Sequence, residues 1–278
     1  MKIEKLFDIT GRVCVITGGG GLLGRIFAAS VLEGGGIPVL LDIAQQAIDD
    51  SVDALKREFG SKIIFHSFLC DITSLEQISI VKNRLLECFG KIDILVNNAA
   101  NNPKMENDAE NIFRVSFTNM PLAIWNIDLA VGLTGTFLCS QIFGAVMEKQ
   151  GSGVIVNIAS DYGIIAPDQR IYKRDKYPEE DPIIKPVSYS VVKHGIIGIT
   201  KYLASYWGNV GIRVNTLCPA SVNNGQPLEF VKKISELIPL GRMSEPNEFK
   251  AAMLFLISDA SSYMTGSTIL LDGGRTII

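Results

Sequence analysis

The stretch "VITGGGGLLGRIFAAS", residues 15–30, decides the fold. A β-branched run reaches Thr17, a glycine cluster follows, and an apolar-periodic segment begins at Leu22. Glycine lets the backbone turn sharply and approach a pyrophosphate, and a following helix offers unpaired N–H groups and a positive dipole. The spacing Gly19-x-Gly21-x-x-Gly24 also fits the generic dinucleotide pattern. The stretch therefore predicts a strand–turn–helix unit that binds a dinucleotide.

The rest of the chain alternates short β-branched runs with longer helical patterns. The runs are apolar on both faces, which is typical of a parallel sheet covered by helices on each side. The alternation favours one doubly wound α/β domain spanning residues 1–278. The strand candidates are 12–17, 37–42, 63–67, 92–96, 154–159, 212–217 and 268–271, and the helix candidates are 22–33, 44–59, 74–89, a long one ending near 147, 188–207 and 246–258.

The composition narrows the class of protein. The chain has 278 residues, is 47% hydrophobic and carries a formal net charge of −3, so neither nucleic acid nor an anionic membrane is an expected partner. No signal peptide or membrane-spanning stretch is expected, and the cytoplasm is the expected compartment. Five scattered cysteines predict buried reduced thiols rather than disulfides. The two histidines have no second ligand at motif spacing, so no metal site is expected.

The second strand candidate ends in Asp42. A carboxylate at this position accepts hydrogen bonds from the adenosine ribose hydroxyls and repels a 2′-phosphate. No arginine follows that would receive such a phosphate. The sequence therefore favours NAD over NADP, and a helix N-cap role for Asp42 is compatible with that.

Two Tyr-x-x-x-Lys patterns occur, at Tyr172–Lys176 and Tyr189–Lys193. Tyr172 lies in a charged run with prolines close behind, so no stable helix is expected there. Tyr189 enters an apolar-periodic segment that places both side chains on one helix face. A nearby ammonium favours the phenolate, and hydride transfer to a carbonyl needs a proton donor. Tyr189 and Lys193 are the predicted proton-transfer pair, and Tyr172 is a candidate lid residue.

Taken together, these motifs resemble the short-chain dehydrogenase/reductase family over nearly the whole chain. The motifs that carry the resemblance are the glycine loop Thr17–Gly24, Cys70-Asp71, Asn97-Asn98-Ala99-Ala100, Val156-Asn157-Ile158-Ala159-Ser160, Tyr189-x-x-x-Lys193, Arg213-Val214-Asn215 with Pro219-Ala220, and Asp272-Gly273-Gly274. The resemblance implies a single-domain Rossmann fold with a seven-stranded parallel sheet. It also implies an NAD(P)-dependent oxidoreductase that forms a homodimer or homotetramer.

The resemblance implies three catalytic roles. Tyr189 is the implied general acid/base, and Ser160 is the implied group that holds the substrate oxygen. Lys193 is the implied group that binds the nicotinamide ribose and lowers the pKa of the tyrosine. The cofactor-binding residues that it implies are Gly18, Gly21, Leu23, Gly24, Asp42, Asp71, Ile72, Asn98, Ala99, Tyr189, Lys193, Pro219 and Val222.

The chain also departs from the family pattern. Gly132 stands where members commonly have an asparagine, which indicates a modified proton relay, with loss of activity as the alternative. Glycine at this position can also permit a helix irregularity of its own. Polar segments at 101–121 and 168–185 read as inserted loops that flank the substrate cleft, or else as solvated surface. Six polar residues are available for hydroxyl recognition near the expected cleft edges: Asp161, Asp168, Gln169, Asn223, Asn224 and Gln226.

By analogy, these features look most like dehydrogenases of sugars, polyols or sugar acids, including those of surface-glycan and nonulosonic-acid pathways. The expected substrate is small and polar or anionic, and the expected cofactor is NAD. Two alternatives stay open. One is a nucleotide-sugar epimerase or dehydratase with bound NAD, and the other is a non-catalytic NAD-binding sensor.

Overall fold

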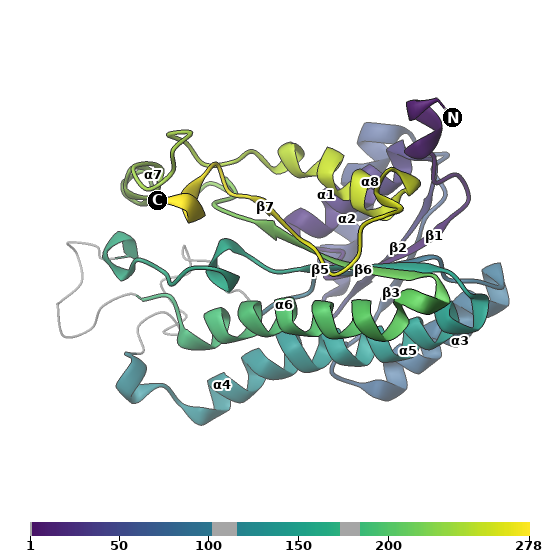
Figure 1. Cartoon of the computed structure of the whole chain (residues 1–278), viewed down its shortest axis with the longest axis horizontal. Helices are drawn as coiled ribbons and strands as arrows, with labels where there is room; N and C mark the ends of the chain where they lie inside the picture. The colour runs from purple at the N-terminus through teal and green to yellow at the C-terminus, as the bar shows by residue number, and fades with distance from the viewer. Residues whose placement is uncertain (1, 102–115, 173–183) are drawn as a thin grey trace.

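The computed structural model describes residues 2–101, 116–172 and 184–278. Its centre is a seven-stranded sheet in the order β3-β2-β1-β4-β5-β6-β7, in which every pair is parallel (Figure 1). The strands are β1 Val13–Thr17, β2 Ile37–Asp42, β3 His66–Leu69, β4 Ile94–Asn97, β5 Gly153–Ile158, β6 Ile212–Pro219 and β7 Thr268–Leu271. The order reverses between β1 and β4, and ligands of open α/β sheets bind at such a point.

Helices cover both faces of the sheet (Figure 1). The helices α1 Leu22–Glu33, α2 Gln45–Phe59 and α8 Lys250–Ile257 pack on one face, and α3 Leu75–Phe89, α5 Gly135–Gln150 and α6 Val187–Trp207 pack on the other. Each face of the sheet has its own hydrophobic core, and alternate strand residues point into one or the other. Cys14 and Ile16 belong to the first core, beside α1, α2 and α8, and Val13 and Val15 belong to the second, beside α3, α5 and α6. The predicted doubly wound fold is confirmed.

Two predicted elements differ from the structure. The third strand forms at His66–Leu69, further along than the 63–67 run, because β2 pairs with residues from His66 onward. Ile63 and Phe65 pack beside the first core instead. The short helix α7 Leu228–Ser235 was not predicted, because eight residues hold too few helical repeats to stand out.

The long helix is continuous from Leu122 to Gln150. It comprises α4 Leu122–Leu129, a π-helical turn Ala130–Thr134, and α5. By length and composition it could cross a membrane, which corrects the expectation that no stretch has this character. Cys139, Phe143 and Met147 are fully buried in the second core, so packing under the sheet accounts for part of its apolar composition.

The five cysteines are all free. Cys14, Cys70, Cys139 and Cys218 are buried, as predicted, whereas Cys88 is exposed. The exception lies in the last turn of α3, one residue before its final residue Phe89.

Candidate active site

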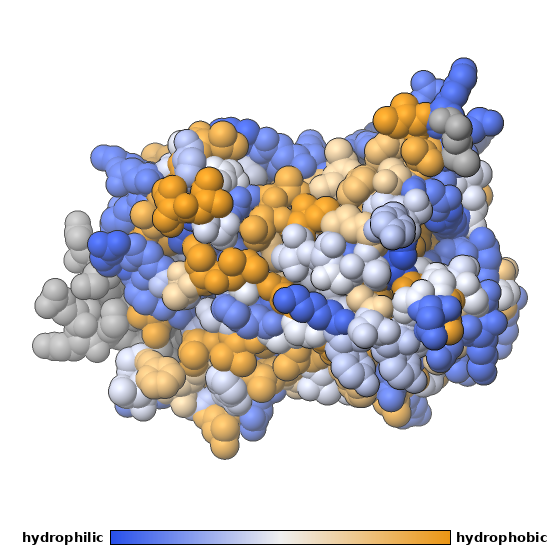
Figure 2. Space-filling model, viewed as in Figure 1, coloured by the Kyte–Doolittle hydropathy of each residue, from blue (hydrophilic) through white to orange (hydrophobic). Residues whose placement is uncertain are grey.

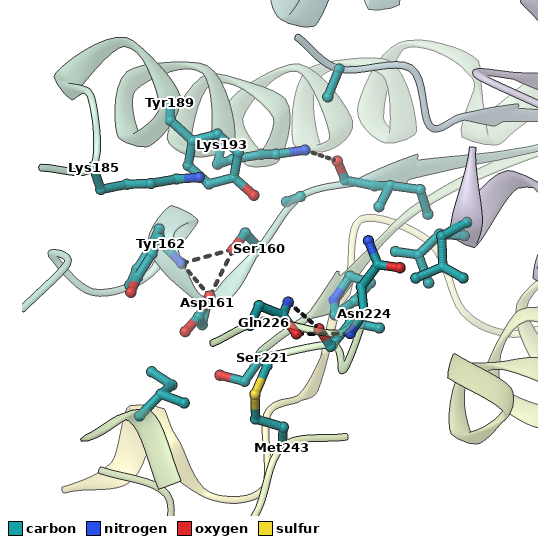
Figure 3. Close-up of a pocket in the computed structure, with 18 of the residues that line it drawn as sticks. Ser160, Asp161, Tyr162, Lys185, Tyr189, Lys193, Ser221, Asn224, Gln226 and Met243 are labelled. Atoms are coloured by element: carbon teal, nitrogen blue, oxygen red, sulfur yellow. Dashed lines mark hydrogen bonds between the residues drawn. The ribbon is translucent and has the colours of Figure 1, made fainter. Parts of the chain in front are cut away.

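A cleft of about 450 Å³ lies at the carboxyl ends of the central strands. Seven of the predicted site residues line it: Gly21, Leu23, Ser160, Tyr189, Lys193, Pro219 and Val222. Figure 3 shows Tyr189, Lys193 and Lys185 along one side of the cleft, with Asn224, Gln226 and Met243 across from them. The structure therefore brings the predicted catalytic side chains and a substrate-sized space together.

Ser160, Tyr189 and Lys193 converge from two elements. Ser160 follows β5, and the other two lie one turn apart at the start of α6. The Nζ atom of Lys193 donates to the carbonyl oxygen of Ile158 at 2.9 Å and lies 5.5 Å from the centre of the Tyr189 ring. Burial is the largest influence on the pKa of Tyr189 and raises it. Burial lowers the pKa of Lys193 to about 8.

A second lysine reaches the same tyrosine. The Nζ atom of Lys185 lies 3.8 Å from the centre of the Tyr189 ring, and Lys185 lines the cleft. Burial, with the nearby charge of Lys193 as a second cause, lowers the pKa of Lys185 to about 8. Sequence reasoning placed Lys185 in an inserted loop and missed this contact, because no local pattern relates it to Tyr189.

The glycine loop turns tightly against its own backbone and against the end of β4. Gly18 has φ +63°, and a Cβ atom there would lie 2.8 Å from the Cα atom of Ala99. A Cβ atom at Gly24 would collide with the carbonyl oxygen of Gly18. The helix α1 begins after Gly21 without a side-chain cap, so its first N–H groups face outward for a ligand to use. These residues fit a dinucleotide pyrophosphate.

The Asp42 carboxylate ties the loop to the end of β2. Its Oδ2 atom accepts from the Gly20 N–H at 3.0 Å, and its Oδ1 atom accepts from the Ala44 N–H at 3.1 Å. The N-cap residue of α2 is Ala44, so the prediction that Asp42 could also be the N-cap of this helix is wrong. The carboxylate instead lies beside the glycine loop, where it could accept hydrogen bonds from the hydroxyls of an adenosine ribose.

The remaining predicted cofactor residues lie at neighbouring strand ends, outside the lining of the cleft. The Asn98 amide donates to the carbonyl oxygens of Thr17 and Gly18 at 3.0 and 3.1 Å and so joins β4 to the glycine loop. Asp71 accepts from the Thr73 N–H and hydroxyl at 2.8 and 2.7 Å. Ile72 is buried in the second core, and Ala99 packs beside it.

The polar residues expected for hydroxyl recognition divide into two groups. Asn224, Gln226 and Asp161 line the cleft, although the Asp161 carboxylate already accepts from Ser160 and Tyr162. The other three lie outside its lining and form other contacts: Asp168 with Arg170 at 2.6 Å, Gln169 with the main chain of Lys185 at 3.1 Å, and Asn223 with Glu245 at 3.0 Å.

Two family models together match most of the chain, including the residues of this site. Residues 12–172 match the model described as short chain dehydrogenase, and residues 180–276 match the one described as Enoyl-(Acyl carrier protein) reductase. The chain belongs to the short-chain dehydrogenase family. It is therefore an oxidoreductase by family, and the predicted resemblance at that level is confirmed.

Individual relatives cover the full dehydrogenase chain. It is 31% identical to a D-threitol dehydrogenase of Mycolicibacterium smegmatis, with 100% of this chain and 97% of the relative covered. It is 34% identical to an NAD-dependent glycerol dehydrogenase of Listeria innocua (99% and 97%) and 30% identical to an NADP-dependent mannitol dehydrogenase of Hypocrea jecorina (99% and 96%). The structure of an NAD⁺-bound xylitol dehydrogenase superposes with a TM-score of 0.80 at 26% identity, covering 95% and 99% of the two chains.

An aromatic and apolar wall closes one side of the dehydrogenase cleft. Its residues are Tyr162, Tyr172, Phe230, Ile234 and Met243. The Tyr172 hydroxyl lies 3.0 Å from that of Tyr162, and its ring centre lies 5.6 Å from that of Phe230. Tyr172 ends a short 3-10 turn and is only 4% exposed, so it is part of the wall. Lys176 and the rest of its charged run lie outside the described residues.

Gly132 lies in the middle of the π-helical turn, so the helix irregularity that glycine was expected to permit is present. A Cβ atom at this position would collide with the Cγ1 atom of Val192 on α6. The Gly132 carbonyl oxygen accepts from the Thr136 hydroxyl at 2.8 Å. In this dehydrogenase the glycine allows α6, which carries Tyr189 and Lys193, to pack closely against the long helix.

Proposed function

We propose that the protein uses NAD to oxidise a hydroxyl group of a polyol, sugar or sugar acid, and to reduce the corresponding carbonyl. The observation that carries the proposal is the convergence of Ser160, Tyr189 and Lys193 on one cleft. Across the cleft, Asn224 and Gln226 offer hydrogen bonds, and the aromatic wall offers apolar surface for the C–H faces of a sugar. Relatives named for threitol, glycerol and mannitol support the substrate class.

The chemistry divides between the cofactor and the chain. Oxidation takes a hydride from the carbinol carbon, which the bound nicotinamide accepts, and a proton from its oxygen. The Tyr189 phenolate accepts that proton, and Ser160 hydrogen-bonds to the same oxygen. The Lys193 ammonium stabilises the phenolate and would bind the nicotinamide ribose. In the reverse direction the Tyr189 hydroxyl returns the proton.

The preference for NAD rests on Asp42. Its carboxylate lies beside Gly20 at the loop, where it would repel a 2′-phosphate. Asp42→Ala should raise the ratio of kcat/KM for NADP over NAD about tenfold or more, because that repulsion is lost. Steady-state kinetics with both cofactors measures the ratio. Asp49→Ala, at an exposed position on α2, is the control, and an unchanged ratio in Asp42→Ala would remove Asp42 from the cofactor argument.

The substrate class is tested with a panel of polyols, aldonates, uronates and sugar nucleotides, with NAD reduction followed at 340 nm, the usual NADH band. Turnover of polyols or aldonates is the expected result. Preference for aldonates would identify an anionic substrate and would fit the two ammonium groups near Tyr189. Tight, non-exchanging NAD with sugar-nucleotide turnover would favour the epimerase alternative, and NAD binding with no turnover would favour the sensor alternative.

Three further attributes belong to the proposal. The protein acts in the cytoplasm, as its free cysteines suggest, and it assembles as a homodimer or homotetramer. That the segments 101–121 and 168–185 are inserted loops stays a prediction, because residues 102–115 and 173–183 lie outside the described part of the chain. A role in surface-glycan or nonulosonic-acid synthesis stays a prediction.

A further inference from the structure

A buried ion pair lies directly behind Ser160. Asp161 follows Ser160 in the turn after β5, and Arg275 lies beyond β7 in the final turn Arg275–Ile277. Their side chains are 5% and 3% exposed, and the Arg275 Nε atom lies 2.9 Å from the Asp161 Oδ2 atom. Replacing such a buried pair by apolar residues is often neutral or stabilising, so stability alone does not explain why it lies beside the site.

The contacts of Asp161 favour its carboxylate form, against burial, which raises its pKa. Its Oδ1 atom faces the Ser160 hydroxyl at 2.7 Å and the Tyr162 N–H at 3.0 Å. Its Oδ2 atom faces the guanidinium of Arg275, which stays protonated in proteins. Since both oxygens face donors, neither is left to carry a proton. A carboxylate only accepts hydrogen bonds, so the Ser160 hydroxyl is the donor to Asp161.

Ser160 has a single proton, which it donates to Asp161, and one of its lone pairs faces the Tyr162 N–H at 3.3 Å. What remains toward Tyr189 and the cleft is a lone pair. We propose that Asp161 and Arg275 are positioning residues that make Ser160 a hydrogen-bond acceptor toward the reacting oxygen. The site then prefers the hydroxyl form of the substrate over its carbonyl form. This inference rests on the proposed function, because it concerns the same reacting oxygen.

The preference follows from the two forms of the substrate. A substrate hydroxyl donates to Ser160, whereas a carbonyl oxygen has no proton to donate and is left with Tyr189 as its donor. An enzyme does not change the equilibrium of its reaction. The preference therefore appears as a lower Kd for the hydroxyl form of the substrate than for the carbonyl form. The rate constants of the forward and reverse reactions change in compensation, so that the overall equilibrium is unchanged.

Asp161→Asn reverses the arrangement with an isosteric side chain. Its amide oxygen would face Arg275, which turns the amide N–H groups toward Ser160 and directs the serine proton into the cleft, while the Tyr162 N–H loses its carboxylate acceptor and keeps only the Ser160 oxygen at 3.3 Å. The test uses dead-end ternary complexes: the polyol with enzyme and NADH, and the ketose with enzyme and NAD⁺. The probes are glycerol with dihydroxyacetone and mannitol with fructose, titrated by calorimetry. The Kd of the polyol should rise about tenfold and that of the ketose should fall about tenfold, as for one hydrogen bond each.

Companion variants separate positioning from a loss of structure. Arg275→Lys keeps a cation beside Asp161 and should retain the wild-type ratio of the two Kd values, whereas Arg275→Met should shift the ratio in the same direction as Asp161→Asn. Asp259→Asn is the matched control, because Asp259 forms an exposed ion pair with Arg12 at 2.7 Å, remote from the cleft. An unchanged NAD Kd in each variant shows that the fold is retained.

The outcomes distinguish the inference from the proposed function. If the wild type turns over a polyol but the two Kd values of Asp161→Asn stay unchanged or move in the same direction, the inference is wrong and the proposed function stands. If the wild type neither binds nor turns over any polyol–ketose pair, the proposed function fails and the inference fails with it.

Discussion

At the scale of single residues, burial controls the charges in the cleft. Lys193 is 4% exposed, and burial lowers its pKa to about 8. Lys185 shares this direction for the same reason. Both values lie below the ordinary lysine pKa of about 10.4. In the folded protein these two ammonium groups therefore lose their protons at a lower pH than in the unfolded chain.

This difference predicts how stability depends on pH. Between about pH 8 and pH 10 the unfolded lysines keep protons that the folded ones release, so the free energy of unfolding rises with pH in that window through these two groups. Buried thiols such as Cys70, whose pKa burial raises to about 11, act in the opposite direction, so the lysine contribution appears as a difference between variants. Lys193→Met should make the slope of the free energy of unfolding against pH less positive than in the wild type, because one of the two lysines is gone. Urea unfolding at several pH values measures it, with Lys201→Met, an exposed position on α6, as the control. An equally steep rise in Lys193→Met would contradict the cited pKa shift.

Several residues of the site could be predicted from sequence because their signals are local. The glycine loop, the i, i+4 pair Tyr189–Lys193, and Ser160 at a strand end each lie within a few residues of the element that positions them. Asp161–Arg275 and the contact of Lys185 with Tyr189 could not be predicted in this way. The first joins residues more than a hundred positions apart, and the second joins Lys185, just before α6, to Tyr189 without any sequence pattern that relates the two.

At the scale of elements, the π-helical turn allows α6 to pack closely against the long helix. Gly132 offers no Cβ atom, so Val192 packs directly on the helix backbone. The start of α6 is held further by Ser188, whose hydroxyl donates to the buried Asp128 of α4. Asp128 also accepts from the Asn101 amide at 2.7 Å. The elements around the catalytic pair are therefore fixed by close packing and by a buried carboxylate.

Restoring the family's usual residue here should be costly. Gly132→Asn should destabilise the protein by about 1–3 kcal/mol, because the new side chain collides with Val192 in a packed interface. Gly132→Asn/Val192→Ala should recover part of this loss, since it makes room for the side chain. Urea unfolding measures both, with Val192→Ala alone as the reference for its own cavity. Wild-type stability in Gly132→Asn would show that the interface is looser than described.

The π-helical turn itself was not predicted, although a helix irregularity at Gly132 was expected. The sequence around it, AVGLTG, contains two glycines, which weaken a regular helix without specifying a π-helical turn. The strands and α1 were predicted more closely, because their apolar runs are bounded by turn residues.

At the scale of the whole molecule, apolar side chains remain exposed on the helical layer formed by α4, α5 and α6. Leu122 and Ile127 on α4, Phe137 on α5, and Tyr202 and Tyr206 on α6 range from 47% to 70% exposed. Figure 2 shows apolar residues over the region of α4, interspersed with polar ones. A layer of this kind supports the proposed homo-oligomer, because exposed apolar patches commonly mark interfaces.

Charges on this layer should therefore change the subunit count. Phe137→Glu or Tyr206→Glu should convert the oligomer into smaller species, since a buried unpaired charge opposes association. Light scattering after gel filtration measures the mass. Ile64→Glu, an exposed apolar position just before β3, is the control and should leave the mass unchanged. A wild-type protein that runs as a monomer would overturn the assembly proposal.

The central claim is that Tyr189 transfers the proton at the reacting oxygen. The most direct measurement compares wild type with Tyr189→Phe for NADH formation on the best polyol or aldonate of the panel, with NAD affinity titrated separately. Tyr189→Phe should lose at least about a thousandfold in turnover, because the proton acceptor is gone, and should keep NAD binding within a few fold. Undiminished turnover in Tyr189→Phe, with NAD binding intact, would contradict the account.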